Sequence, residues 1–123
     1  MNENNRQGVG ANVADNVTAT GANPNLPGFA DANLDSHWNT HKDEYSGLTK
    51  EQYSQRAQDL LQSPTGDNVL GYKTLDGAVV RYDRTTRDFV KGYDTGIATM
   101  FLLRGGETRF AKIMQREGGF QND

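Results

Sequence analysis

The sequence predicts an α+β domain in which N-terminal helices pack on a twisted antiparallel sheet of four to five strands. Two observations favour this fold class. Residues 36–62 carry apolar side chains at helical spacing, whereas the chain after Gly66 breaks into short β-type runs separated by turns. Helices that precede a strand meander are typical of α+β domains. With 123 residues, the chain is long enough for one compact domain.

Residues 1–34 are predicted to form a flexible leader, and residues 35–123 the folded domain. Asn, Gly, Ala and Asp dominate the leader, which has few large apolar side chains, such as Leu26 and Phe29. It also lacks a sustained hydrophobic period. We therefore expect the core to come from the residues after Asp35.

Two helices are expected at the start of the domain. Asp35 suits the N-cap of a helix over 36–45. Thr49 and Gln52 fit a capping box, and the helix that they open should stop before Pro64. This second helix is the clearest helical signal in the chain.

The strands are expected to form an antiparallel meander. Asp76-Gly77 is a strong signal for a tight hairpin between the first two strands. The last strand is the most apolar run, so we expect it to be central in the sheet. Residues 108–114 fit either a fifth strand or a short helix. The four predicted strands span 69–74, 78–83, 87–91 and 95–103.

The composition excludes several classes of protein. The chain has no cysteine, which excludes disulfides, zinc thiolates and thiol nucleophiles. The lack of disulfides favours work in a reducing compartment, or passage through a membrane in an unfolded state. There is no apolar run long enough to span a bilayer and no signal peptide, so we expect no stable membrane association.

The positive charge is concentrated in the second half of the chain. The net charge of −3 argues against a nucleic-acid-binding protein, but residues 84–116 contain seven bases against three acids. Two interpretations remain open, an ordinary solvated surface and a local basic face for a phosphate backbone. The second is reasonable because screening makes the nearby patch matter more than the net charge.

Three titratable side chains are expected along one stripe of the first helix: His37, His41 and Glu44. The two histidines could share a metal ion, although no further histidine exists to complete the site. They could also be structural residues beside Trp38. The remaining interpretation is general acid–base chemistry, because imidazole titrates near neutrality and suits proton transfer at a ribose hydroxyl.

The strands supply further candidates. Arg81 should share a strand face with Asp83, where it could hold a phosphate or form an ion pair. Thr99 could donate its hydroxyl to a phosphate, or serve only as a β-forming residue. Lys91 is either a surface lysine or a phosphate contact. Tyr93, in a turn, is the aromatic residue freest to stack on a nucleotide, whereas the others are expected in the core.

Taken in order, these segments resemble a known family, the C-terminal tRNase domains of contact-dependent growth inhibition proteins (CdiA toxins). Those domains belong to the barnase/EndoU/colicin/RelE-like group of RNases. The resemblance covers residues 36–104, and Asn2-Glu3-Asn4-Asn5 is similar to the junction that opens many such toxin regions. The segments that carry it are His37-Trp38-x-x-His41-x-x-Glu44-Tyr45, Glu51-Gln52-Tyr53, Asp76-Gly77-x-Val79-Val80-Arg81-Tyr82-Asp83, Asp88-Phe89 and Gly96-Ile97-Ala98-Thr99-Met100-Phe101.

The resemblance implies a metal-independent RNase with its site in the cleft of the sheet. Such enzymes need no cofactor, and they activate the ribose 2′-hydroxyl against the adjacent phosphate to leave a 2′,3′-cyclic phosphate. Carried onto this chain, His41 transfers a proton, Arg81 holds the phosphate and Thr99 assists. The further candidates are His37 for catalysis and Lys91, Asp83 and Tyr93 for substrate binding.

The resemblance also implies the biological setting. The substrate would be tRNA, and a cognate immunity protein would cover the basic cleft. Some toxins of this type also use a translation factor of the target cell. The chain would be delivered from the surface of the producing cell and act in the cytoplasm of the target bacterium. It departs from the family at Thr40, where a basic residue is expected, and residues 104–117 do not align.

Two alternatives stay open. A non-enzymatic interaction module, such as a phage structural or adaptor fragment, would use the histidines only for stability. A metal-dependent nuclease would lose its activity in EDTA, but the acidic residues do not cluster beyond Asp43-Glu44.

Overall fold

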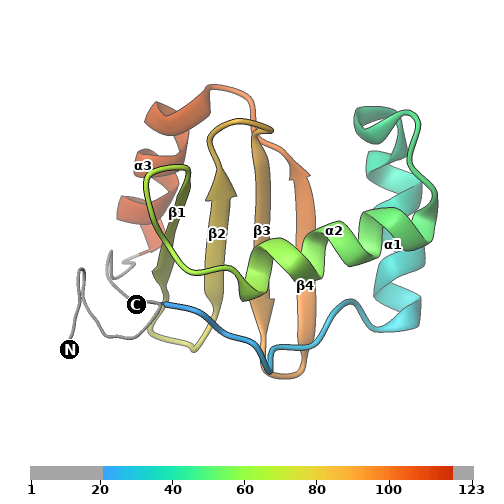
Figure 1. The fold of residues 1–123 in the computed structure, drawn as a ribbon, viewed down its shortest axis with the longest axis horizontal. Helices are drawn as coiled ribbons and strands as arrows, with labels where there is room; N and C mark the ends of the chain where they lie inside the picture. Colours follow the sequence, from blue (N-terminus) through green and yellow to red (C-terminus); the bar gives the residue numbers. More distant parts are fainter. Residues whose placement is uncertain (1–20, 118–123) are drawn as a thin grey trace.

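The computed structural model describes residues 21–117, and it confirms the α+β class. The four strands form one antiparallel sheet in the order β1-β2-β3-β4. Figure 1 shows α2 crossing the sheet, α1 beside β4 and α3 beside β1. The elements are α1 (Asp31–His41), a 3-10 helix η1 (Lys42–Tyr45), α2 (Lys50–Gln62), β1 (Val69–Lys73), β2 (Val79–Asp83), β3 (Asp88–Tyr93), β4 (Gly96–Leu102) and α3 (Gly106–Glu117).

Each face of the sheet buries its own apolar cluster, because neighbouring strand residues point to opposite faces. Val79 and Val90 belong to the cluster beneath α2, whereas Val80, Tyr82 and Phe89 belong to the cluster beneath α3. We call these two sides the α2 face and the α3 face. The sheet is therefore covered from both sides, by the predicted helix α2 and by α3, whose segment fitted either a strand or a helix from the sequence.

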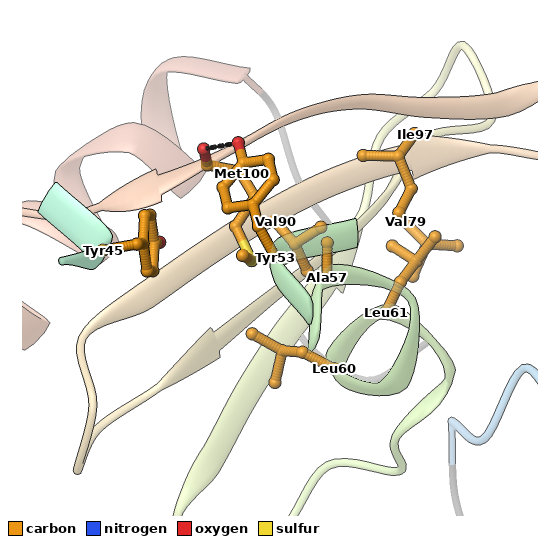
Figure 2. Packing of buried hydrophobic residues seen from close by; sticks show 9 residues of the cluster. All are labelled: Tyr45, Tyr53, Ala57, Leu60, Leu61, Val79, Val90, Ile97 and Met100. Atoms are coloured by element: carbon orange, nitrogen blue, oxygen red, sulfur yellow. Dashed lines mark hydrogen bonds between the residues drawn. The ribbon is translucent and has the colours of Figure 1, made fainter. Parts of the chain in front are cut away.

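The capping box predicted at the start of α2 is confirmed. The Thr49 hydroxyl accepts from the Gln52 amide, and the Gln52 side chain accepts from the Thr49 amide. Both bonds satisfy helix N-terminal N–H groups that would otherwise lack partners. The buried side of α2 packs into the cluster in Figure 2, where the Tyr53 hydroxyl donates to the Met100 carbonyl.

The hairpin predicted at Asp76-Gly77 is confirmed. Gly77 has a φ of +93°, which a residue without a side chain adopts at little cost. The Gly77 amide donates to the Thr74 carbonyl, and the Thr74 amide donates to the Ala78 carbonyl. This tight turn places Tyr72 opposite Val80 in the β1–β2 register.

The prediction that the most apolar strand is central was wrong, because β4 is the last strand of the sheet. Its outer edge is covered by α1 and the chain before it. The Ile97 amide donates to the Gly28 carbonyl, and the Asn33 side chain donates to the carbonyls of Ile97 and Ala98. Edge strands are commonly protected in this way, and the cover permits an apolar sequence at an edge.

The predicted start of the first helix was also too late. The first helix begins at Asp31, five residues earlier than expected, with Ala30 as its N-cap. Upstream, the Leu26 carbonyl accepts from the side chain of Gln62, and Phe29 packs against the core. These few apolar residues lie among small and polar ones in the sequence, so the segment shows no hydrophobic pattern that would have indicated its contacts with the core. Residues 1–20, including the junction motif at 2–5, lie outside the described residues.

The C-terminal segment that fitted either a strand or a helix is the helix α3. Phe110 is buried against the rings of Tyr72, Tyr82 and Phe89, at centroid distances of 5.5, 5.3 and 6.3 Å. Ile113 and Met114 pack against the same cluster. No helix between residues 21 and 117 is long and apolar enough to cross a membrane.

Candidate functional site at the edge of the sheet

The helix that carries both histidines is tied to β4 at two points. Near its start, Asn33 Nδ2 donates to the Ile97 carbonyl at 2.7 Å. Beyond its end, Glu44 Oε1 accepts from the Leu102 amide at 2.9 Å. Since both ends of β4 are anchored to this segment, the helical turn between them is held against the strand. That turn carries His37 and His41.

The His37 ring lies between a strand hydroxyl and two other rings. Its Nδ1 is 3.2 Å from Thr99 Oγ1, within hydrogen-bond distance. The rings of Phe29 and His41 are its neighbours, each with its centroid 5.8 Å away. Burial lowers the pKa of His37 below its usual value, and the nearby charge of His41 lowers it further. His37 is therefore mainly neutral at pH 7.

His41 is oriented by a carboxylate. Its Nδ1 is 2.6 Å from Glu44 Oε2, and its ring stacks on Phe101 at 5.8 Å. When Nδ1 donates to the carboxylate, the neutral ring presents Nε2 as an acceptor. No residue of the described chain hydrogen-bonds to Nε2. With 18% of its side chain exposed, His41 remains accessible.

The sheet adds Lys91 and Thr99 to this site. They are directly opposite each other in the β3–β4 ladder, so their side chains share the α3 face. Lys91 Nζ lies 2.7 Å from Glu117 Oε2, and this hydrogen bond raises the pKa of the lysine. Tyr72 also donates to Glu117. An ammonium has three N–H donors, so Lys91 keeps donors beyond the one that Glu117 uses.

Arg81 is not part of this site. The side chain is fully buried on the α2 face, where Nε donates to the Ser63 carbonyl at 2.9 Å. Nη2 donates to the Gly21 carbonyl, and Nη1 donates to the Val80 carbonyl at 2.9 Å. A Cβ atom at Gly71 would overlap the guanidinium, so that glycine makes the room for it. The guanidinium joins the end of α2 to the N-terminal segment instead of facing a ligand.

Asp83 and Tyr93 also lie apart from the histidines. Asp83 Oδ1 accepts from the amides of Thr85 and Thr86, and so closes the β2–β3 turn. Asp83 also lines an open groove of 520 Å³ beside the Arg56–Asp88 ion pair. Tyr93 donates to Asp76 Oδ2 at 3.0 Å, at the hairpin end of the sheet.

The geometry does not favour a metal site. In the part of the chain that the structure describes, no group of three or more His, Asp or Glu side chains is placed to hold a metal ion. His37 and His41 are stacked with an interplanar angle of 14°, and their Nδ1 atoms have different partners.

Sequence reasoning placed Glu44 beside the histidines but did not assign it a role. Its spacing of three residues from His41 was the available signal, because such residues are neighbours on a helix. Glu117 was missed, since its contact with Lys91 depends on the course of α3 across the sheet. A scan against protein-family models and a search of curated proteins each found no match for this chain.

The lowered pKa of His37 can be measured by following its ring proton by NMR. We expect a midpoint below 6.5, and a rise in that midpoint in His41→Gln, because the variant removes the neighbouring charge. Since the pKa is lower in the folded chain than in the unfolded chain, the unfolded chain binds more protons, and His37 makes stability fall as pH drops through 6.5. A His37 midpoint at or above 6.5 would contradict the burial described here.

Proposed function

We propose that this chain is an antibacterial toxin RNase that cleaves tRNA without a metal ion or other cofactor. The observation that carries the proposal is the stacked pair His37 and His41, of which His41 is bound to Glu44. Two adjacent imidazoles in different environments are suited to act as base and acid in one reaction. The resemblance to the CdiA tRNase domains supports this assignment.

The proposed reaction uses both rings at one phosphodiester. His37, which is mainly neutral, takes the proton from the ribose 2′-hydroxyl, and the 2′-oxygen attacks the adjacent phosphorus. His41, which Glu44 orients through Nδ1, gives a proton from Nε2 to the departing 5′-oxygen. The P–O5′ bond breaks, and the products are a 2′,3′-cyclic phosphate and a free 5′-hydroxyl.

Two neighbouring groups would stabilise the charge that develops on the phosphate. The Lys91 ammonium and the Thr99 hydroxyl share the α3 face beside the histidines. Donors aimed at developing charge in a partly dry site commonly supply much of an enzyme's rate enhancement. Arg81, which is buried on the other face, has no part in this scheme.

The proposal extends to partners. A cognate immunity protein would protect the producing cell by covering the α3 face, where it would block access to His41. Delivery from the cell surface and action in the cytoplasm of the target bacterium rest on the family resemblance. The same resemblance is the basis for a translation factor as an activating partner.

The test is to incubate the purified chain with total bacterial tRNA, with and without EDTA. We expect discrete fragments that persist in EDTA and end in 2′,3′-cyclic phosphate, because the histidines and not a metal transfer the protons. Loss of cleavage in EDTA would favour a metal-dependent nuclease. Intact tRNA, both with pure protein and in bacterial extract, would favour the non-enzymatic interaction module.

A further inference from the structure

Helix α3 carries three exposed cations that the proposed reaction does not use. They are Arg109, Lys112 and Arg116, and together we call them the basic flank. No acidic side chain among residues 21–117 pairs with any of them, in contrast to Arg84, which lies 3.0 Å from Glu107. Unpaired cations in a chain whose net charge is −3 mark a local region of positive potential.

Contacts at both ends of α3 show which way the basic flank points. Glu107 pairs with Arg84, which also donates to the Asp67 carbonyl just before β1, so this flank of α3 faces the β1 side. Arg109 and Arg116 follow Glu107 by two and nine residues. At about 100° per residue, both lie roughly half a turn round the helix from Glu107.

Between these two flanks, Phe110 and Glu117 face the sheet. Arg109 and Arg116 therefore lie on the flank that is turned toward β3 and β4. Lys91 and Thr99 occupy the same face of those strands, and the histidines are at its far edge. Because neighbouring strands are about 4.8 Å apart, the basic flank and the histidines are separated by roughly 10–15 Å across the sheet.

The surface between them contains an aromatic ring as well as charge. Phe101 is only partly buried, and it stacks on His41 and on Phe89. Basic side chains beside accessible aromatic rings are typical of surfaces that bind single-stranded nucleic acid, because the cations hold phosphates and the rings stack on bases. A partner that is recognised only through carboxylates would leave this ring without a contact.

We propose that the basic flank of α3 holds the phosphate backbone of a single-stranded RNA segment whose scissile phosphate lies at His37 and His41. This inference rests on the proposed RNase function for the position of the cut, but the binding itself does not require cleavage. It gives a role to residues 104–117, for which the family resemblance offered none. It also extends the bound RNA beyond the two nucleotides on either side of the cut.

The test compares Arg109→Gln/Arg116→Gln with a control of equal charge change, Lys73→Gln/Arg87→Gln, which removes two exposed cations from other parts of the surface. The probe is a 2′-O-methyl oligoribonucleotide of about 12 nucleotides, a length within the usual range for single-strand binding sites. It cannot be cleaved, because its 2′-oxygens carry no proton. Circular dichroism and thermal melts check that both variants fold.

We expect the α3 double variant to bind the oligonucleotide about tenfold more weakly at moderate salt, with the control unchanged. The slope of log K against log salt should become shallower by about 1.4, since each lost phosphate contact on a single strand contributes about 0.7. Cleavage of a dinucleotide should be unaffected, because such a substrate does not reach α3.

Three outcomes would overturn the inference: no binding by the wild-type chain, equal weakening in both double variants, or equal affinity for a polyglutamate of similar length. The proposed RNase function and the proposed binding surface are contradicted by different results. If binding depends on the basic flank but no RNA is cut, the function is wrong and the binding surface stands. If dinucleotides are cut but the flank has no effect, the function stands and the binding surface is wrong.

Discussion

Replacing His41 with alanine is expected to lower kcat/KM for tRNA cleavage by about 10²–10⁴-fold, the usual contribution of a general acid or base. The reason is that the variant removes the ring whose Nδ1 is held by Glu44 and whose Nε2 has no hydrogen-bond partner among the described residues. The measurement is the rate of fragment formation at equal concentrations of folded protein.

A structural role for His41 would look different. The ring stacks on Phe101, and its partner Glu44 also accepts from the Leu102 amide, so His41→Ala should lower stability somewhat. Glu44→Gln is the matched control, because an amide keeps one acceptor oxygen for Leu102 but has no second carboxylate oxygen to hold His41 Nδ1. We expect Glu44→Gln to fold normally and to cut more slowly than the wild type. If His41→Ala unfolds at a lower temperature but its folded fraction cuts at the wild-type rate, the histidine is structural.

The elements that local chemistry determines were predictable from the sequence. The capping box at Thr49 and the Asp76-Gly77 turn each depend on residues close together in the chain, and the structure confirms both. The strands were located for the same reason, since their ends are marked by turn residues. Their order followed from the short connections, which favour pairing between sequence neighbours.

The elements that depend on tertiary contacts were not predictable. An apolar strand was expected in the centre, but β4 is apolar because α1 covers its edge, and that cover involves residues such as Asn33 and Ile97 that are far apart in the sequence. The alternation of side chains along β2 predicted that Arg81 shares a strand face with Asp83. It did not predict which groups surround the Arg81 side chain. Gly71 is its direct partner in the β1–β2 register, and a glycine opposite a strand arginine was the sequence signal for a guanidinium lying over the neighbouring strand.

The candidate site was predictable in part. His37, His41 and Glu44 were placed on one stripe because helical spacing alone brings them together. Thr99 was singled out on its strand, but its contact with His37 depends on how α1 docks against β4. The separation of Arg81 and Asp83 from the histidines was beyond prediction, since alternation along a strand does not show which face of the sheet the site will use.

Replacing Phe110 with alanine is expected to lower the free energy of unfolding by about 3–5 kcal/mol, the usual cost of deleting a buried phenylalanine. Phe110 is 4% exposed and is the one buried residue of α3, where it joins the helix to rings on β1, β2 and β3. A loss of this size is a large fraction of the roughly 5–15 kcal/mol that stabilises a typical domain. Denaturant unfolding monitored by circular dichroism measures it.

The controls separate the loss of packing from other effects. Phe110→Leu keeps most of the apolar volume and should cost less than the alanine variant, whereas Leu75→Ala changes a side chain that is 81% exposed and should stay within about 0.5 kcal/mol of wild type. Because Phe110 positions the helix that carries Arg109 and Arg116, its loss should also weaken oligonucleotide binding under conditions where the chain remains folded. A Phe110→Ala variant within about 1 kcal/mol of wild type would mean that α3 is not firmly docked, and the basic flank would then have no fixed position relative to the histidines.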